Sequence, residues 1–320
     1  MTSTPSPVAV VLAVALLATL TMATTTTNTT WFTASLDGNI YALDPENGSL
    51  DPRGSFSWNG TDELQLTLSQ SVAAGDAAGE RAYFAANNVG ETPAAVIVAV
   101  DVSVTPVTFV QSQIYPFYVD VIHVDGDDLV VLANLGNEAI QLKAIDATSL
   151  KVLHNLTTPI YDVELVPGAG SAFNAEANIF TVQLYSFKYG IRLVSLNVSA
   201  HNNTILYFPQ MVAAVVKMAY SPQHDAVFGI VGGGVLPVFG YLISPITGAF
   251  SDRHQLTDGL GAFADLSYGF SAATGDVLIG VPRYSGSTDF TLATTATIPF
   301  QTAAKFSLPY LATQIVVAMA

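Results

Sequence analysis

The chain has 320 residues, with 10 Lys or Arg against 25 Asp or Glu, so its formal net charge at pH 7 is -15. This excess of acid argues against nucleic-acid binding, because proteins that bind nucleic acids use basic patches to neutralise phosphates. Hydrophobic residues make up 50% and charged residues 11%, a balance that allows a buried core and that disordered chains lack. The absence of cysteine excludes disulfides, thiol catalysis and cysteine-ligated metal centres.

The first segment of the chain has the sequence pattern of a secretory signal peptide, an apolar run followed by a cleavage site. An uncharged apolar run extends from Val8 to Leu20, and the small residues Thr21 and Ala23 fit the -3 and -1 positions of a cleavage site. The run is shorter than the roughly 20 residues of a membrane span, which favours cleavage over a retained anchor. The sequence therefore predicts a signal peptide over 1–23, a threonine-rich lead-in over 24–30 and a single folded domain over 31–320.

Six N-x-[ST] sequons follow the predicted signal peptide. Their asparagines are Asn28, Asn47, Asn59, Asn155, Asn197 and Asn202. Such sequons accept N-linked glycans in secreted proteins. A single sequon arises easily by chance in a chain rich in Asn, Ser and Thr. Six of them behind a signal peptide indicate a secreted or cell-surface glycoprotein, with some of the six unused.

From Trp31 onwards, short runs of β-branched and aromatic residues alternate with turns of Gly, Pro, Asn, Asp and Ser. In chain order, clear runs are 128–135, 139–146, 177–186, 191–198 and 276–283. Each has the length and composition of a strand. No stretch of a dozen residues shows a helical period. The sequence therefore predicts an all-β fold.

One sequence pattern repeats along the chain: an apolar strand ends in a polar residue, and a turn and a second apolar run follow. The polar residues are Asp44, Asp101, Asp146, Asn197 and Ser244, with a degenerate copy at Thr297, at a mean spacing of about 50 residues. Each can accept hydrogen bonds from the free amides of its turn. A period near 50 residues with four short strands is typical of a β-propeller blade. Residues 31–320 are long enough for six blades.

The two ends of the predicted domain fit the closure of a ring. The domain begins with what reads as the second and third strands of a blade, 31–37 and 39–44, while the apolar tail 314–320 has no partner in the last blade. Pairing the tail inside Trp31–Leu36 completes the first blade and removes exposed strand edges. A lipid-anchor signal is the alternative for the tail, but it lacks the spacer and the length. We therefore predict a six-bladed β-propeller of four-stranded blades, closed by this pairing.

Residues 35–50, SLDGNIYALDPENGSL, resemble one repeat of the pyrroloquinoline-quinone-type propellers. The other blades resemble more generally the NHL and lactonase-like six-bladed propellers. Such propellers include hydrolases, lactonases, lyases and plain binding scaffolds, so the resemblance concerns the fold. The lactonase-like members hold a metal near the channel mouth, and the resemblance implies that region as a place to look. No quinone-enzyme active-site motif is visible.

Common catalytic motifs are absent from the sequence. It contains no G-x-S-x-G elbow, no H-E-x-x-H and no P-loop, and its five histidines show no metal-ligand spacing. The acidic run Asp125–Asp128 has the spacing that opens a calcium loop, but the later ligands are missing. A tight hairpin is the expected structure there.

The predicted innermost strands each carry one polar residue near their start. These residues are Gln65, Asp120, Asp162, Lys217, Asp265 and Gln314. Innermost strands line the channel of a propeller, so we expect these side chains to form a ring at one level. Glu164, two residues after Asp162, adds a carboxylate on the same face of its strand.

The carboxylates of this ring suggest a cation site. Asp120, Asp162, Glu164 and Asp265 offer the oxygen ligands that Ca²⁺ or Mg²⁺ prefers. A metal held there would polarise a carbonyl or activate water. Lys217 departs from a pure metal ring and would neutralise a neighbouring carboxylate or bind an anion. The structural alternative is that a wet channel accommodates polar side chains without any ligand.

The predicted loops between the second and third strands of the blades gather polar and aromatic residues on one face. They include Asn87, Asn88, Glu91, Asn137, Glu138, Tyr185, Lys188, Tyr189, Arg283 and Tyr284. Because no nucleophile–base set is evident, we expect a binding or adhesion scaffold for an extracellular protein or glycan, without nucleic acid and without a membrane span after cleavage. The alternative is a metal-dependent hydrolase or lactonase at the channel mouth. A structural domain of an extracellular matrix or wall is a third alternative.

Overall fold

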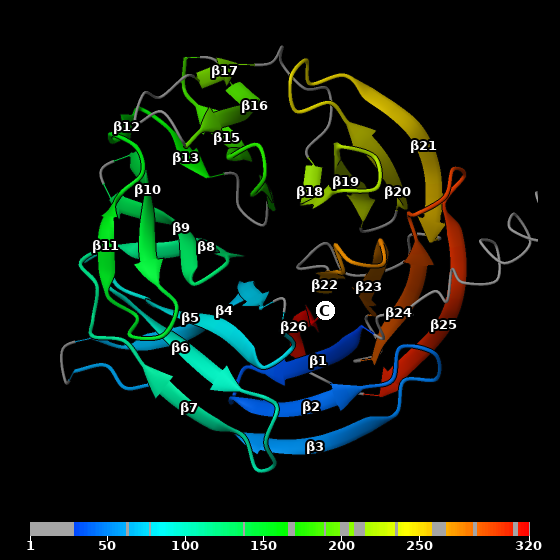
Figure 1. Cartoon of the computed structure of the whole chain (residues 1–320), viewed down its shortest axis with the longest axis horizontal. Coiled ribbons are helices and arrows are strands. Elements are labelled where there is room, and N and C mark those ends of the chain that lie inside the picture. Colours follow the sequence, from blue (N-terminus) through cyan, green and yellow to red (C-terminus); the bar gives the residue numbers. More distant parts are fainter. Residues whose placement is uncertain are drawn as a thin grey trace, which may run out of the picture.

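The computed structural model describes residues 29–319, apart from 62–63, 77, 137, 166–169, 189, 199–204, 208–214, 234–235, 258–266, 284–286 and 310–312. The described residues form six antiparallel sheets arranged as a ring (Figure 1). All of their regular elements are strands. This confirms the predicted all-β, six-bladed propeller. The predicted signal peptide lies outside the described residues.

The strands of each blade follow one another outwards from the middle of the ring. Blade 1 contains β26 (Thr313–Met319), β1 (Thr30–Ser35), β2 (Asn39–Leu43) and β3 (Leu50–Ser55); blade 2 contains β4 (Leu66–Gly75), β5 (Arg81–Asn88), β6 (Ala95–Asp101) and β7 (Thr108–Gln111). Blade 3 contains β8 (Tyr118–Asp125), β9 (Asp128–Gly136), β10 (Ala139–Asp146) and β11 (Val152–Asn155), with β12 (Ile160–Tyr161) beside β10. Blade 4 contains β13 (Glu164–Leu165), β14 (Ser171–Asn174), β15 (Ile179–Ser186), β16 (Gly190–Asn197) and β17 (Ile205–Tyr207). Blade 5 contains β18 (Val215–Ser221), β19 (Ala226–Gly233), β20 (Leu236–Ile243) and β21 (Phe250–Thr257); blade 6 contains β22 (Ser267–Phe270), β23 (Asp276–Pro282), β24 (Ser287–Thr294) and β25 (Gln301–Pro309).

The ring closes by the predicted pairing of the chain ends. β26 lies antiparallel to β1, with Thr30 opposite Met319 and Ala34 opposite Ile315. β26 becomes the innermost strand of blade 1, and β1, β2 and β3 follow outwards (Figure 1). The C-terminal strand therefore completes a blade that the N-terminal strands leave one strand short.

The hydrophobic core lies between the blades. Six clusters of buried residues each combine side chains from two neighbouring blades. β6 illustrates the cause, because successive residues of a strand point to opposite faces. Val96, Val98 and Val100 pack towards blade 1, whereas Ala95, Ile97 and Ala99 pack towards blade 3. A strand buried on both faces reads as a continuous apolar run, which is how the central strands appear in the sequence.

The repeated polar residue caps the hairpin between the third and fourth strands, as predicted. Asp44 accepts a hydrogen bond from the Glu46 amide at 2.9 Å, and Asp146 accepts one from the Ser149 amide at 2.5 Å. Ser244 does the same for the Thr247 amide at 3.1 Å. Among the hairpins that the structure describes, the degenerate copy in blade 6 was placed wrongly.

In blade 6 the third strand ends at Thr294 rather than near Thr297. The Thr294 hydroxyl accepts the hydrogen bond from the Ala296 amide, at 3.4 Å. The run of threonines in this segment hides the strand end, because each of them could cap a turn. Between the first and second strands of blade 3, Asp125 pairs with Asp128 in a tight hairpin, as expected.

In blade 4, the single inner strand expected from the sequence is divided. Two short strands replace it: β13 pairs with the end of β15 through Glu164 and Tyr185, and β14 pairs with the beginning of β15 through Ser171 and Val182. Pro167 and the glycines Gly168 and Gly170 separate the two strands in the sequence, and Pro cannot donate to a ladder.

The antiparallel topology gives the ring two distinct faces. The links between second and third strands, and the connections from one blade to the next, lie on one face, which we name the upper face. The hairpins between first and second strands and between third and fourth strands lie on the opposite, lower face. No helix long and apolar enough to cross a membrane occurs among the described residues.

Candidate functional site

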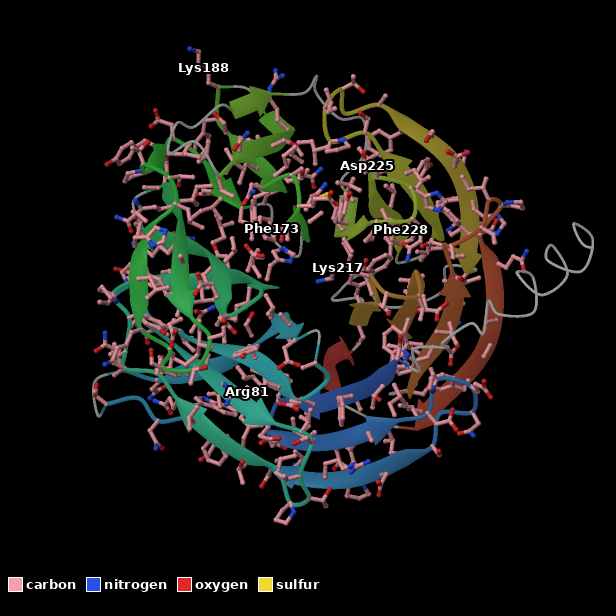
Figure 2. The ribbon with its side chains drawn as sticks, viewed as in Figure 1. Arg81, Phe173, Lys188, Lys217, Asp225 and Phe228 are labelled. Atoms are coloured by element: carbon pink, nitrogen blue, oxygen red, sulfur yellow. The ribbon has the colours of Figure 1, made fainter. Side chains whose placement is uncertain are left out.

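The described residues of the predicted polar ring lie on or beside the inner strands of their blades. Gln65 is exposed just before β4, and its carbonyl accepts a hydrogen bond from the Val89 amide at 3.1 Å. Asp162 and Glu164 are exposed at the start of blade 4, and Lys217 is buried in β18. Figure 2 shows Lys217 at the inner edge of its blade, beside the middle of the ring. Asp265 and the side chain of Gln314 lie outside what the structure describes.

The strand registers place Asp120 and Lys217 at different levels. In blade 3, Val119 pairs with Ala133 and Val121 with Leu132, so Asp120 is the extra residue of a β-bulge. In blade 5 the same bulge falls on Val216, because Val215 pairs with Val231 and Lys217 with Ile230. Lys217 therefore corresponds to Val121. Counting residues along the sequence cannot locate a bulge, which explains the shift of one position.

Asp120 is held in a defined environment at this bulge. The neighbouring blade fixes its backbone, since the Asn87 amide donates to the Val119 carbonyl and accepts from the Val119 amide, both at 2.9 Å. Burial raises the pKa of Asp120 to about 6, against the lowering effect of a hydrogen bond from the Asn134 side chain. Asn134 is oriented by the Gly136 amide, which donates to its oxygen at 3.0 Å. A carboxyl that titrates near neutrality on an inner strand is a candidate acid or base.

A histidine–serine contact between blades 3 and 4 was not anticipated from the sequence. His123 Nε2 lies 2.8 Å from the Ser171 hydroxyl, and the imidazole packs against the rings of Phe173 and Phe180. Burial lowers the pKa of His123 to about 4. An imidazole this weakly basic is a poor general base at neutral pH, where catalysis favours a pKa near 7. We therefore interpret the pair as a structural bond between two inner strands.

The carboxylates of the predicted metal set do not gather among the described residues. No group of three or more His, Asp or Glu side chains with a metal-binding arrangement occurs in the part of the chain that the structure describes. Of the four predicted ligands, Asp120 lies in the bulge of β8, Asp162 and Glu164 lie at the start of blade 4, and Asp265 falls in the undescribed segment 258–266. Calcium or magnesium binding stays a prediction.

The upper face exposes large apolar side chains. The four most exposed ones among the described residues are Phe187 at 76%, Val89 at 71%, Ile246 at 69% and Tyr161 at 66%. Three of these four lie on the upper face, and Ile246 lies in a hairpin of the lower face. Isolated exposed apolar residues are common, but a group of them marks an interaction site.

Tyr161 and Phe187 belong to loops that contact each other, so they form one surface. Tyr161 pairs with Ala139 beside Glu138, and the Val163 amide donates to the Glu138 carbonyl at 3.2 Å. Further along the same connection, Glu164 pairs with Tyr185. We name the resulting patch the loop surface and define it by six residues: Glu138, Tyr161, Asp162, Glu164, Tyr185 and Phe187.

Two aromatic rings of the loop surface contact each other, and two of its carboxylate residues have an unusual backbone conformation. The ring of Tyr185 meets that of Phe187 edge to face, with 5.4 Å between centroids. Glu138 and Asp162 have positive φ angles of 55° and 59°. Such angles are uncommon for residues other than glycine and are frequent where a fold fixes side chains for a function.

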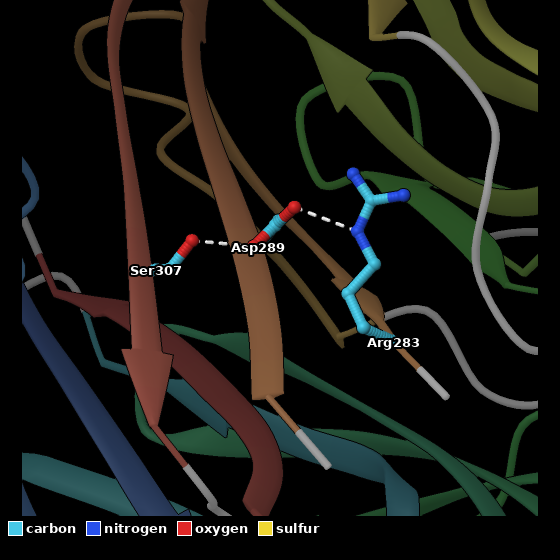
Figure 3. Close-up of polar contacts among 3 residues, drawn as sticks. All are labelled: Arg283, Asp289 and Ser307. Carbon is cyan, nitrogen blue, oxygen red and sulfur yellow. Dashed lines mark hydrogen bonds and ion pairs between the residues drawn. The ribbon is translucent and has the colours of Figure 1, made fainter. Parts of the chain in front are cut away.

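Other residues of the predicted loops have structural partners instead. The Asn88 amide donates to the Thr92 carbonyl at 2.8 Å, within its own loop. In blade 6, Arg283 Nε donates to Asp289 at 2.6 Å, and Ser307 donates to the other oxygen of the same carboxylate (Figure 3). Burial would raise the pKa of Asp289, but these two hydrogen bonds and the charge of Arg283 hold it below its usual value. Asn137, Tyr189 and Tyr284 lie outside the described residues.

Four of the six sequon asparagines are described. Asn47, Asn59 and Asn155 are exposed, and Asn197 is partly buried at the end of β16. The side-chain oxygen of Asn155 accepts the hydrogen bond from the buried Lys143 ammonium at 2.8 Å. This bond does not involve the side-chain nitrogen, to which an N-linked glycan would be attached. Asn28 and Asn202 lie outside the described residues. None of the six asparagines belongs to the loop surface.

Comparison with solved structures finds the same fold at low sequence identity. TolB from Acinetobacter baumannii aligns with a TM-score of 0.58 and 12% identity, over 91% of this chain and 66% of that one. A putative 6-phosphogluconolactonase from Bacteroides uniformis aligns with a TM-score of 0.53 and 11% identity, over 88% and 82% of the two chains. A putative TolB from Agrobacterium tumefaciens aligns with a TM-score of 0.53 and 8% identity, over 89% and 92%. No family model and no curated protein matches the sequence.

These similarities agree with the resemblance of the blades to lactonase-like propellers. At such identities they concern the fold alone, and function has to be argued from the site.

Proposed function

We propose that this chain is a secreted glycoprotein that binds an extracellular protein or glycan, without catalysis, through the loop surface. The observation that carries the proposal is the exposure of Tyr161 and Phe187 on neighbouring loops, in a chain whose other aromatic rings form much of the core. Exposed aromatic side chains supply contact area at a low cost in conformational entropy, and they dominate many binding surfaces.

The described sequons lie away from the loop surface. Asn47 and Asn197 are at the lower face, where the third strands of their blades end, and Asn155 is on the outermost strand of blade 3. Asn59 lies on the upper face, but in the connection from blade 1 to blade 2, away from the loop surface on blades 3 and 4, and its backbone is held by the Gln111 side chain. Glycans at these asparagines would leave the loop surface open to a partner. Peptide mapping before and after glycosidase treatment of the secreted protein tests which asparagines carry glycans.

Arrays of extracellular proteins and glycans, probed with the purified mature chain, test the binding function. We expect a ligand whose affinity falls at least tenfold in the Tyr161→Ser/Phe187→Ser variant, because both side chains contribute contact area. Thermal unfolding should stay unchanged, because both side chains are exposed. Ile246→Ser is the matched control, since it removes an equally exposed apolar side chain from the lower face. Absence of any ligand, or equal losses in both variants, would contradict the proposal.

A second candidate function rests on the raised pKa of Asp120, about 6, on an inner strand. A metal-dependent hydrolase or lactonase would use Asp120, Asp162, Glu164 and Asp265 as ligands, and the cation would have to draw together the three described carboxylates, which form no metal-binding group in this structure. Thermal melts in EDTA and with Ca²⁺ or Mg²⁺ added back test it, because a cation that binds the native state raises the melting temperature. A rise that Asp120→Ala abolishes would favour this function. Identical melts in all conditions would exclude it.

A further inference from the structure

We infer that the ligand of the loop surface is a basic, extended segment of a protein that carries an apolar side chain. This inference rests on the proposed binding function and specifies its partner. It depends on three observations: the charge beside the exposed rings, the engagement of nearby amide and guanidinium groups, and the shape of the connection that carries the surface.

The charge around the exposed rings is negative. Glu138, Asp162 and Glu164 are all exposed beside Tyr161 and Tyr185. Lys188 is the one cation in the segments 136–138, 160–165 and 185–188. Figure 2 shows it at the outer rim of the ring. Three carboxylates against one peripheral ammonium favour a cationic partner, and the net charge of -15 for the whole chain would steer such a partner towards the protein.

Among the described loop residues, three side chains that could recognise a sugar are engaged elsewhere. Asn87 uses both ends of its amide on the backbone of Val119, and the amide nitrogen of Asn88 donates to the Thr92 carbonyl. Arg283, on the far blade 6, is bound to Asp289. An acidic glycan would also be repelled by the carboxylates of the loop surface. A peptide with Lys or Arg and an apolar side chain matches the groups that remain.

The surface follows the connection between blades 3 and 4, in which two short strands flank a bend at Asp162, whose φ is 59°. Residues 160–165 run beside β10 at Tyr161 and then beside β15 at Glu164, so the exposed groups succeed one another across two blades (Figure 1). An extended peptide presents successive side chains on alternate sides. One such segment can therefore place an apolar side chain against Tyr161 or Phe187 and its basic neighbours beside Asp162 and Glu164.

Fluorescence anisotropy with synthetic peptides tests this partner chemistry on the full mature chain. The probe is a labelled twelve-residue peptide in which lysines flank two central leucines. One matched peptide has glutamate in place of lysine, and another has serine in place of leucine. We expect the lysine–leucine peptide to bind at least tenfold more tightly than either, with an affinity that falls as salt rises.

Matched protein variants separate specific binding from attraction to an acidic protein. Glu138→Gln/Asp162→Asn/Glu164→Gln should weaken binding at least tenfold. Glu46→Gln/Asp127→Asn/Glu176→Gln removes the same charge from exposed positions in lower-face turns and should weaken it less than twofold. Equal losses in the two triple variants would overturn the inference.

The outcome for the partner and the outcome for the function can be told apart. A glycan or acidic protein that binds and is lost in Tyr161→Ser/Phe187→Ser would refute the basic partner and leave the binding function intact. If no array ligand and no peptide binds, both proposals fail.

Discussion

Asp120 is the residue whose position suggests function more than stability. Its carboxyl lies in a bulge on an inner strand, and burial raises its pKa from the ordinary value to about 6. A carboxyl that is harder to ionise in the folded state lowers stability above its folded pKa, and the penalty disappears as the pH falls below about 4. Natural chains retain such a group where it has a use or where its neutral form makes a bond.

Asp120→Asn should therefore stabilise the protein at neutral pH. We expect a gain of about 1–2 kcal/mol in the free energy of unfolding at pH 7.5, because the amide is never ionised. At pH 4, where Asp120 is protonated in the folded state, the gain should vanish. Urea denaturation of both proteins at the two pH values measures the difference. A variant that is less stable at pH 7.5 would mean that the carboxylate itself makes a stabilising bond.

His123 should produce a pH dependence of the opposite sign. Its pKa is lowered to about 4 in the folded protein, so between about pH 6.5 and 4 the unfolded chain takes up a proton that the folded chain does not. The stability contributed by the neutral imidazole is present above pH 6.5 and is lost as the pH falls through this window, by up to about 3 kcal/mol.

His123→Gln isolates this effect, since Gln can still bond to Ser171 but does not titrate. The variant should be less stable than the wild type by about 1–3 kcal/mol at pH 7.5, owing to lost packing against Phe173 and Phe180. The difference should shrink as the pH approaches 4. Thermal unfolding of both proteins across this range measures it. Parallel curves would show that His123 is accessible to protons in the folded state.

At the scale of the strand and its turn, the repeated capping residue should make a measurable contribution to the free energy of unfolding. Asp44 accepts hydrogen bonds from the Glu46 amide at 2.9 Å and from the Asn47 side chain at 2.7 Å. Asp44→Ala removes both acceptors and should cost about 1 kcal/mol. Asp44→Asn keeps one acceptor and should recover at least half of the loss. Urea denaturation of the deglycosylated wild type and of both variants measures these differences. An Asp44→Ala variant as stable as the wild type would show that the cap does not stabilise the fold.

This same repeated element explains how far the sequence could predict the structure. An apolar strand that ends in a polar residue recurs once per blade in the sequence, and the caps at Asp44, Asp146 and Ser244 show the reason, because each accepts hydrogen bonds from free amides of its turn. The pattern therefore predicts the blades and their order. Features that break the repeat were not predictable in this way: the bulge at Asp120 leaves the apolar alternation of its neighbours intact, and the division of the inner strand of blade 4 depends on pairing with β15.

The candidate site was less accessible to sequence reasoning than the fold. Tyr185 and Glu138 fall in recognisable loops, but Tyr161 belongs to a connection between blades, and its exposure depends on pairing with β10. The contact of His123 with Ser171 joins strands of two blades, and no local pattern marks either residue. Sequence periodicity reports the neighbours along a strand, whereas these contacts depend on how blades pack against one another.

At the scale of the whole molecule, the ring depends on a strand contributed by the far end of the chain. β26 supplies the inner partner of β1, and Met319 lies opposite Thr30. A chain that ends at Pro309 would leave β1 with an open edge, and open edges pair with other molecules. We expect this truncated chain to form oligomers and to lose its cooperative unfolding transition, as measured by sedimentation and thermal melting.

A rearranged chain distinguishes loss of the strand from loss of the chain end. Because the end of β26 lies beside the start of β1, residues 313–319 can be moved ahead of Thr30 and joined to it by a short Asn-Gly turn, which suits a hairpin. Blade 1 would then have its four strands in consecutive order, like blades 2, 5 and 6. This variant should be monomeric and melt within about 5 °C of the wild type. If it aggregates like the truncated chain, closure requires more than the pairing of β26 with β1. If the truncated chain itself stays monomeric and stable, the ring does not depend on this strand at all.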